Sequence, residues 1–161
     1  MQHSSFPDGQ DKANSYKKIE VSSAAFKENE LIPRRYTCDG KNVNPALNLD
    51  HIPNESQSLA IIVDDPDAPA GTWVHWVIWN IPVIHHVKED HAPGLQGIND
   101  FKKKIYCGPC PPKGIHRYFF KVYSLDCALQ IPENSNKQDL EIAMAGHILG
   151  FGELIGLYKR D

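Results

Sequence analysis

The sequence predicts a mainly β domain with one helix, and three observations support this prediction. Residues 73–81 and 116–125 are mostly apolar on both faces when read with the two-residue period of a strand, as expected for strands covered on both sides. Residues 58–63 form a compact apolar run rich in β-branched side chains, which is typical of a buried strand. Residues 136–150 carry apolar side chains at helical spacing. Many strands, long connections and one helix indicate a β-rich single domain.

Length, composition and charge narrow the class further. The chain has 161 residues, of which 41% are hydrophobic and 23% charged, enough to bury a core without disulfide or metal staples. The formal charge of −3 gives no overall basic surface for nucleic acid or anionic lipid, so any anion must be bound locally. No apolar run approaches the ~18 residues of a membrane span.

Residues 1–15 are polar and are expected to be a flexible arm, followed by a single domain over residues 16–161. The arm holds no apolar segment of the kind that directs secretion, so the expected location is the cytoplasm. Four cysteines are too few for a disulfide scaffold at this length, and a reducing compartment favours free thiols. The cysteines are Cys38, Cys107, Cys110 and Cys127.

The first half of the chain alternates short strands with turns. Residues 17–22 alternate charged and apolar side chains, which suits a first strand. Residues 32–53 are rich in turn residues and are expected to be irregular with short extended pieces. In the strand over residues 73–81, alternation assigns one face to Trp73, His75, Val77, Trp79 and Ile81. In the strand over residues 116–125, it assigns one face to His116, Tyr118, Phe120 and Val122.

The second half combines a long connection, the helix and a last strand. Residues 82–112 form an irregular stretch of a length that usually carries function or disorder. The sequence Ser135-Asn136-Lys137-Gln138 fits a capping box, so the helix is expected from Asn136 to about Gly150. Residues 153–159 are expected to form the final strand.

A rigid acidic loop is predicted where the 58–63 strand ends. The sequence Asp64-Asp65-Pro66-Asp67-Ala68-Pro69 carries three carboxylates, and its prolines preset the backbone. A solvated turn is the simpler interpretation, because Asp and Pro dominate turns. Two histidines favour a binding site instead. His75 lies near the start of one core strand and His116 opens another, beside Trp73 and Tyr118 respectively.

The chemistry that these residues favour is capture of a small anion. Imidazole has an unperturbed pKa of ~6.5 and can supply donors or positive charge near neutral pH. A nearby carboxylate would orient each ring and favour its protonated form, and the aromatic side chains would exclude water. A divalent metal held by two His and one or two Asp is an alternative that ranks lower, because no metal-type spacing fixes the geometry. A second metal candidate, for which exposed surface is the simpler interpretation, is the cluster His85, His86 and His91.

The motif Cys107-Gly108-Pro109-Cys110 has the letters of a thioredoxin-type redox site. Such a motif should enter a helix within a βαβ unit. Here Pro111-Pro112 follow at once and the context is β-rich, so we reject the redox interpretation. The alternative is a tight loop in which Gly108 lets the backbone approach a ligand closely, leading into His116.

Four segments follow one another along the chain: Asp65-Pro66-Asp67-Ala68-Pro69, Trp73-Val74-His75, Gly108-Pro109-Cys110-Pro111-Pro112-Lys113-Gly114 and His116-Arg117-Tyr118. In this order they resemble the phosphatidylethanolamine-binding proteins, also called Raf kinase inhibitor-like proteins. The likeness runs from about Phe26 to Arg160. Residues 36–40 and 146–156 resemble the bacterial and archaeal branch.

The resemblance implies a large antiparallel sheet, a second small sheet and few helices. It also implies a pocket at one end of the large sheet that holds a phosphate or a phosphoryl headgroup. Carried over by position, the residues that line or support this pocket are Asp65, Asp67, Pro69, Trp73, His75, Gly108, Pro111, His116 and Tyr118. Besides the anion, the expected partners are a regulated protein such as a kinase or a protease, and a second copy in a homodimer. No cofactor, nucleic acid or membrane span is expected.

The chain departs from eukaryotic members of that family at several positions. Only Ala70-Gly71-Thr72 separates the acidic loop from Trp73, and Val74 and Cys110 replace a histidine and a glycine. Cys38 and Cys110 are both expected in loops near the pocket and can bridge if their Cα atoms lie within ~7 Å. Free thiols are nevertheless expected in a reducing cytosol.

Three functions stay open at this point. The first is a non-enzymatic module that binds an anion between His75 and His116, with Asp65 tuning the two rings. The second is an Asp/His hydrolase, with or without a metal, although no serine or cysteine is placed beside a base. The third is an interaction protein whose pocket has no role.

Overall fold

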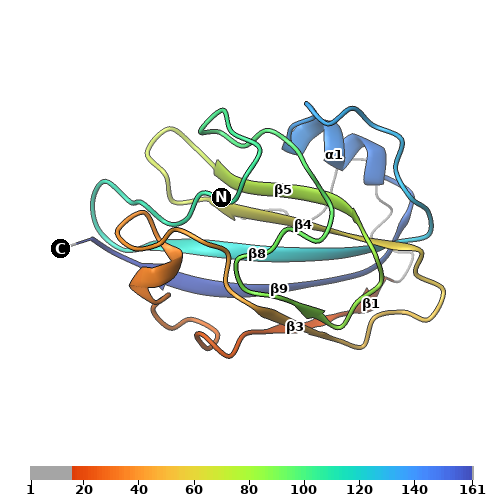
Figure 1. The fold of residues 1–161 in the computed structure, drawn as a ribbon, viewed down its shortest axis with the longest axis horizontal. Helices are drawn as coiled ribbons and strands as arrows, with labels where there is room; N and C mark the ends of the chain where they lie inside the picture. Colours follow the sequence, from red (N-terminus) through yellow and green to blue (C-terminus); the bar gives the residue numbers. More distant parts are fainter. Residues whose placement is uncertain (1–15, 161) are drawn as a thin grey trace.

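The computed structural model describes residues 16–160 and consists of two β-sheets and one α-helix (Figure 1). The arm expected over residues 1–15 lies outside the described residues. The main sheet has six strands in the order β1 (Lys17–Lys18), β9 (Ile148–Tyr158), β8 (His116–Leu125), β4 (Ser58–Asp65), β5 (Trp73–Ile81) and β7 (Leu95–Gln96). The small sheet contains β2 (Glu20–Ser22), β3 (Leu47–Asp50) and β6 (His86–Val87).

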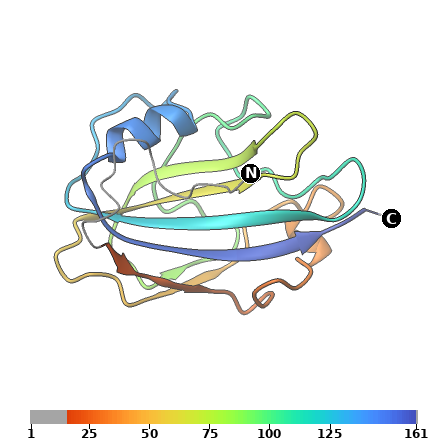
Figure 2. The ribbon, with the colours of Figure 1, turned by 180° about the vertical axis from the view of Figure 1, so that it is seen from behind.

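The two faces of the main sheet are covered by different elements. The helix α1 (Lys137–Met144) packs Leu140 and Met144 on one face, and the small sheet packs Leu49 and Val87 on the other. Figures 1 and 2 show α1 and β3 on opposite sides of the long strands β8 and β9. The central strands therefore bury both of their faces, which confirms the interpretation of the two-sided apolar segments.

The strand predicted over residues 17–22 is divided between the two sheets. β1 pairs in parallel with β9, so the main sheet is mixed, whereas β2 pairs antiparallel with β3 in the small sheet. Between them, buried Ile19 donates its backbone N–H to the Phe151 carbonyl at 2.9 Å. A continuous alternation in the sequence gives no signal of such a change of partner.

The predicted bounds of β5 and β8 are confirmed, and so is the face assignment of β8, whose Tyr118, Phe120 and Val122 lie together in the core beneath the small sheet. The face assignment of β5 is wrong. Val77 and Trp79 lie in the helix-side core, whereas Ile81 lies in the opposite core. Register shifts in the pairing of β4 with β5 interrupt the alternation, and a bulge exchanges the faces of the residues beyond it.

The helix begins where the sequence predicts and ends early. Asn136 is the N-cap, with its side chain accepting from the Asp139 N–H in a capping box. The predicted end at Gly150 is wrong, because Gly146 adopts a φ of 82° and Ile148 pairs with Leu125 as the first residue of β9. Ile148 is buried in the same core as the helix. Its apolar side chain is therefore equally consistent with a continued helix and with a strand.

The remaining segments agree in outline with the sequence. Residues 82–112 are largely irregular and contain only the short strands β6 and β7. Residues 32–53 contain β3 and the short 3-10 helix η1 (Arg34–Tyr36). Within residues 16–160, no helix combines the length and the apolar character that crossing a membrane requires.

Candidate functional site

A cavity of about 410 Å³ opens at the end of the main sheet where β4 ends and β5 and β8 begin. The loops after β4 and before β8 gather at this end, on the left of Figure 1. The lining residues are Asp65, Ala68, Pro69, Ala70, Trp73, His75, Phe101, Cys110, Pro111, Pro112, His116 and Tyr118. Seven of the nine residues assigned to the site from the sequence are among them, and Asp67 and Gly108 are not.

His75 lines the cavity from a bulge in β5. Val63 pairs with Trp76 and Asp64 pairs with Val74, so His75 has no partner residue opposite it in β4. A bulge of this kind re-aims a side chain, and the His75 ring contacts the Tyr118 ring edge-on at 5.3 Å between centroids. The extra residue therefore turns His75 toward the side chains of β8 that face the cavity.

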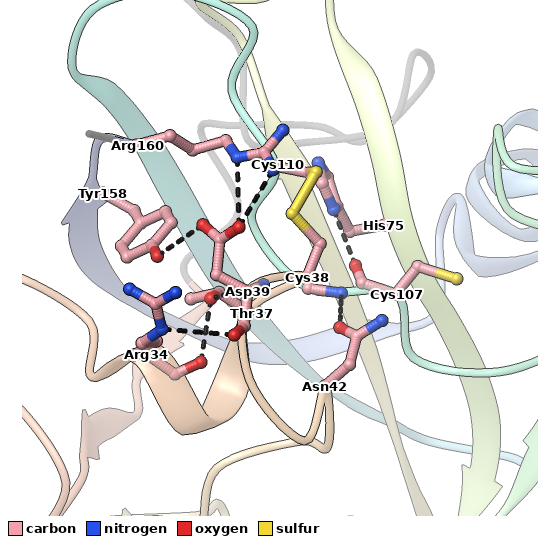
Figure 3. The surroundings of a disulfide bond; sticks show 11 residues. Arg34, Thr37, Cys38, Asp39, Asn42, His75, Cys107, Cys110, Tyr158 and Arg160 are labelled. Atoms are coloured by element: carbon pink, nitrogen blue, oxygen red, sulfur yellow. Dashed lines mark hydrogen bonds and ion pairs between the residues drawn. A yellow bond between two sulfur atoms is a disulfide. The ribbon is translucent and has the colours of Figure 1, made fainter.

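The hydrogen bonding of His75 leaves one ring nitrogen for the cavity. Nδ1 donates to the Cys107 carbonyl at 2.6 Å (Figure 3), and no described residue bonds to Nε2. Burial lowers the pKa of His75, while the Cys107 carbonyl, the Asp65 carboxylate and the Gly108 backbone oppose this effect. The lowered pKa favours the neutral ring at pH 7, with Nε2 as its second polar atom.

His116 is held by two acceptors. Its Nδ1 donates to Asp65 Oδ2 at 2.6 Å, and its Nε2 donates to the Lys113 carbonyl at 3.1 Å. A carboxylate and a carbonyl both accept, so the ring makes both bonds only when both nitrogens carry a proton. The pair is almost fully buried, with 7% of the His116 side chain and 4% of the Asp65 side chain exposed. The site therefore contains a buried hydrogen-bonded pair in which Asp65 and the Lys113 carbonyl fix the orientation of the His116 ring.

Tyr118 lies between the two histidines. Its ring stacks on His116 at 6.5 Å and meets His75 edge-on. The residue is fully buried, and its hydroxyl makes no hydrogen bond of standard geometry, although the Asp65 carboxylate and the Cys110 backbone lie near it. Burial and the nearby Asp65 raise the pKa of Tyr118, so the hydroxyl keeps its proton. A buried hydroxyl without a partner at the wall of a cavity is suited to donate to a ligand.

The three carboxylates of the acidic segment have three different environments. Asp65 belongs to the pocket, but Asp64 is buried on the helix side, where its Oδ2 accepts from Lys121 and Lys137 at 2.8 Å each. Asp67 is partly exposed and forms a two-pronged pair with Arg117 at 2.8 and 3.0 Å. The expected loop also starts later than predicted, because β4 continues through Asp65.

Gly108 packs against protein rather than against the cavity. A Cβ added there would lie 2.1 Å from the Tyr36 carbonyl oxygen, and the Gly108 N–H donates to Asn42 Oδ1 at 2.7 Å. The backbone at Gly108 does make a close approach, as expected. It approaches the backbone at the end of η1 and not a ligand in the cavity. Asp67 and Gly108 both support loops that border the pocket without lining it.

A disulfide joins Cys38 to Cys110, with Cα atoms 5.4 Å apart (Figure 3). The expectation of free thiols is wrong for this pair, because the fold brings together two loops that lie 72 residues apart in sequence. Cys110 lines the cavity, so the disulfide fixes one wall of the pocket to the loop after η1. Cys107 is free and buried, so the two cysteines of the rejected redox motif do not pair with each other.

Several lining residues were not assigned to the site from the sequence. Phe101 packs edge-on against Trp73 and His75, with ring centroids 5.6 and 5.2 Å apart. An aromatic residue within an irregular stretch was the only signal for it, since residues 82–112 show no periodicity. The other unassigned lining residues are adjacent in sequence to assigned residues or to the loops that carry them. They are Ala68, Ala70, Cys110 and Pro112.

The metal alternatives find no support in the geometry of the described residues. Asp65, His75 and His116 are not among the groups of three side chains whose ligand atoms lie mutually within 4.8 Å. His85 and His86 hydrogen-bond to the small sheet, at the Leu49 carbonyl and Asn48 Oδ1. His91 does not join them in such a group either.

A second, polar cavity of about 480 Å³ adjoins the first. Both are lined by Pro112, and the carbonyl of Lys113 in the second cavity holds His116 of the first. Four cations border it, and its one carboxylate, Asp39, accepts from Tyr158 and Arg160 (Figure 3). The cations are Arg34, Lys113, Lys159 and Arg160. A chain of net negative charge thus concentrates positive charge beside the pocket.

Comparison with known proteins identifies the family. Residues 22–159 match the model of the family described as phosphatidylethanolamine-binding protein. A UPF0098 protein of Methanothermobacter thermautotrophicus is 47% identical over 150 residues, covering 88% of this chain and 99% of that protein. A UPF0098 protein of Pyrococcus abyssi is also 47% identical, over 153 residues, covering 88% of this chain and 85% of that protein.

Two solved structures share the fold. A phosphatidylethanolamine-binding protein homologue of Chlamydia trachomatis has a TM-score of 0.86 and 38% identity, covering 90% of this chain and 99% of that one. YbcL of Escherichia coli, described as a member of the mammalian family, has a TM-score of 0.82 and 28% identity, covering 89% and 99%. The chain therefore belongs to the phosphatidylethanolamine-binding protein family, in the UPF0098 branch found in archaea and bacteria.

Proposed function

We propose that this protein is a non-enzymatic binding module whose pocket takes a small anionic group, such as a phosphate or a phosphoryl headgroup, attached to an apolar body. The observation that carries the proposal is a pair of polar groups at the cavity wall for which no hydrogen bond of standard geometry to a described residue is found. They are the hydroxyl of Tyr118 and Nε2 of His75. The Tyr118 hydroxyl can donate to an anion as it stands, and Nε2 of His75 becomes a donor once that ring is protonated.

The charges around the pocket support an anionic guest. The Asp65 carboxylate is engaged by His116 Nδ1 at 2.6 Å, so its Oδ2 is turned to the ring rather than to the cavity. The adjoining basic cavity adds positive charge on the Lys113 side. Low-dielectric walls strengthen the attraction between an anion and a protonated His75.

The walls also select what the anion is attached to. Trp73, Phe101 and Pro111 line the mouth, and Trp73 is 38% exposed although it is aromatic. Aromatic and proline side chains offer an apolar surface to the rest of the ligand. A bare inorganic anion leaves this surface uncovered.

A binding role fits the side chains of the cavity better than the hydrolase alternative. Among the described lining residues there is no serine or threonine, and the sulfur of Cys110 is engaged in the disulfide. A nucleophile is therefore not supplied next to His116 or His75. Control of a protein partner such as a kinase or a protease belongs to the same proposal, with occupancy of the pocket as the signal.

Titration calorimetry with benzenesulfonate at pH 6.0 and 8.0 tests this function. The sulfonate stays ionised throughout, so only the protein titrates. Binding should be tighter at pH 6.0, by up to about tenfold per pH unit if one proton is taken up, because His75 must be charged to donate. His75→Gln should abolish the pH dependence, and the exposed histidine variant His51→Gln should leave it intact. Phosphoethanolamine tests the phosphoryl headgroup itself.

A matched pair of probes separates the anion from its apolar body. Trp73→Ala should lower the affinity for benzenesulfonate and leave the affinity for methanesulfonate unchanged. Only benzenesulfonate has a ring that can contact the aromatic wall. Equal affinity at the two pH values, or binding that is the same in His75→Gln and the unchanged protein, would refute the proposed mechanism.

A further inference from the structure

Three metal-ligating side chains converge at the other end of the main sheet, where β8 ends and β9 begins. One ligand atom from each of Asp126, Cys127 and His147 lies within 4.8 Å of the other two. Within residues 16–160 this is the one group of three His, Cys, Asp or Glu side chains with that property. The set supplies one oxygen, one sulfur and one nitrogen.

The backbone that carries these side chains is held by the sheet. Leu125 pairs with Ile148, and beyond this pair the Asp126 N–H donates to the His147 carbonyl at 3.0 Å. The Cys127 carbonyl accepts from Ser58 Oγ at 2.7 Å. These backbone hydrogen bonds hold Asp126, Cys127 and His147 in position before a metal ion binds. Such preorganisation reduces the entropy cost of binding.

The side chains already bond to one another around the carboxylate. His147 Nδ1 donates to Asp126 Oδ1 at 2.8 Å. A hydrogen bond to Asp126 also helps to raise the pKa of the Cys127 thiol, after the larger effect of burial. A metal ion would replace the protons that now link the imidazole and the thiol to the carboxylate.

The exposure of the group leaves room for the ion and for water. The side chains of His147 and Asp126 are 46% and 45% exposed, so one side of the cluster faces solvent. Zinc accepts nitrogen, sulfur and oxygen ligands in tetrahedral geometry and often keeps water in the fourth position. Calcium and magnesium prefer oxygen ligands alone, so a set containing thiolate and imidazole selects against them.

We propose that Asp126, Cys127 and His147 form a zinc site with three protein ligands and an open fourth position for water. This site is separate from the anion pocket, which lies at the opposite end of β8, and it does not depend on the function proposed for that pocket. On binding, the thiol proton passes to solvent, the Nδ1 proton moves to Nε2 so that the imidazole coordinates as a neutral ligand, and no electrons are transferred.

Cobalt(II) titration of the purified protein tests the site spectroscopically. Reductant is omitted so that the Cys38–Cys110 disulfide stays intact. One equivalent of cobalt should give a near-ultraviolet sulfur-to-cobalt band with visible bands of tetrahedral cobalt, and zinc should displace it because zinc binds such ligands more tightly. Cys127→Ser should remove the near-ultraviolet band, and His147→Gln should weaken binding at least about tenfold.

The exposed pair His51 and Glu20 provides the matched control, because it joins a histidine to a carboxylate at 3.7 Å without a thiol. His51→Gln should leave the cobalt spectrum unchanged. A spectrum without the sulfur band, or equal cobalt binding by Cys127→Ser and the unchanged protein, would overturn the proposal.

Thiol alkylation with iodoacetamide keeps the test decisive if a variant fails to fold. Cys127 is half-buried and should react, whereas Cys107 is buried and should not. One equivalent of zinc should slow alkylation of Cys127 at least about tenfold, because the coordinated thiolate is shielded. Unchanged alkylation in the presence of zinc would also overturn the proposal.

Discussion

Asp64 and Asp65 are consecutive residues of β4, and their carboxylates serve opposite faces of the main sheet. Asp64 accepts from Lys121 and Lys137 on the helix side, while Asp65 accepts from His116 at the pocket. Successive side chains of a strand point to opposite faces, so these two neighbouring aspartates have unrelated roles. Asp64 stabilises the packing beneath the helix, and Asp65 orients the His116 ring at the pocket.

Asp64→Asn should destabilise the protein strongly. Burial alone would raise the pKa of Asp64, but the charges of Lys121 and Lys137 outweigh it and lower the pKa. The change removes the carboxylate that accepts from the Lys121 ammonium, whose side chain is only 1% exposed. The expected loss is about 3–5 kcal/mol in the free energy of unfolding, measured with urea.

Asp67→Asn is the matched control for that measurement. Its partner Arg117 is 51% exposed, so the same change should cost no more than about 1 kcal/mol. Similar losses in the two variants would contradict the assignment of Asp64 as the buried structural carboxylate.

Stability should fall as the pH is lowered from 7 to 5, because of His75. Burial lowers the pKa of this ring in the folded protein below its usual value of 6.5. Below pH 6.5 the His75 ring is therefore protonated more readily in the unfolded chain than in the folded protein. The free energy of unfolding then decreases progressively on acidification. Asp39, Asp64, Asp67 and Glu89 have lowered pKa values and act at lower pH.

Urea unfolding at pH 7.0, 6.0 and 5.0 measures this effect. His75→Gln keeps a side-chain donor near the Cys107 carbonyl but does not titrate, so its free energy of unfolding should change less over this range. A slope as steep as that of the unchanged protein would assign the pH dependence to other groups.

Loss of the Cys38–Cys110 disulfide should lower both stability and affinity. The bond closes a loop of 72 residues, for which chain entropy predicts a loss of roughly 4 kcal/mol in the double variant Cys38→Ser/Cys110→Ser. The Cys110 wall of the pocket is then no longer tied to the loop after η1, so benzenesulfonate should bind less tightly. Dithiothreitol should reproduce both effects in the unchanged protein and have none in the double variant.

Lys113→Gln should weaken anion binding through charge alone. The side chain borders the basic cavity, while the backbone carbonyl that holds His116 is retained. Affinity for benzenesulfonate should fall roughly threefold at low ionic strength, and the difference should shrink in 0.5 M salt. Lys18→Gln removes the same charge beside Phe151, near the far end of β9, and should have little effect. Equal losses in the two variants would show that only net charge matters.

Local patterns in the sequence predicted the long elements. β5 and β8 begin and end at the predicted residues, because two-sided apolar alternation and flanking turns mark a central strand. Asn136 marks the start of α1 through its capping chemistry. The end of α1 and the start of β9, which was predicted at residue 153 and lies at Ile148, were misplaced because Ile148 is apolar, and a core position fits either a helix or a strand.

Residue types in the sequence predicted which residues line the pocket. They did not predict how the side chains are oriented within it. Asp65, His75 and His116 stand out as polar residues at the ends of strands, and the tertiary structure brings them to one cavity. The bulge that turns His75 toward Tyr118 depends on how β4 pairs with β5. Alternation within one strand contains no information about its neighbour's register.

The sequence by itself determined which segments are buried strands, where the helix starts and which residue types surround the pocket, because these follow from local periodicity and backbone preference. Only the tertiary structure decided that Cys38 bonds to Cys110, that Asp64 and Asp65 serve different faces, and that Asp126, Cys127 and His147 meet. Each of these depends on distances between segments far apart in the chain. Such distances are set by packing and strand register, which no single segment encodes.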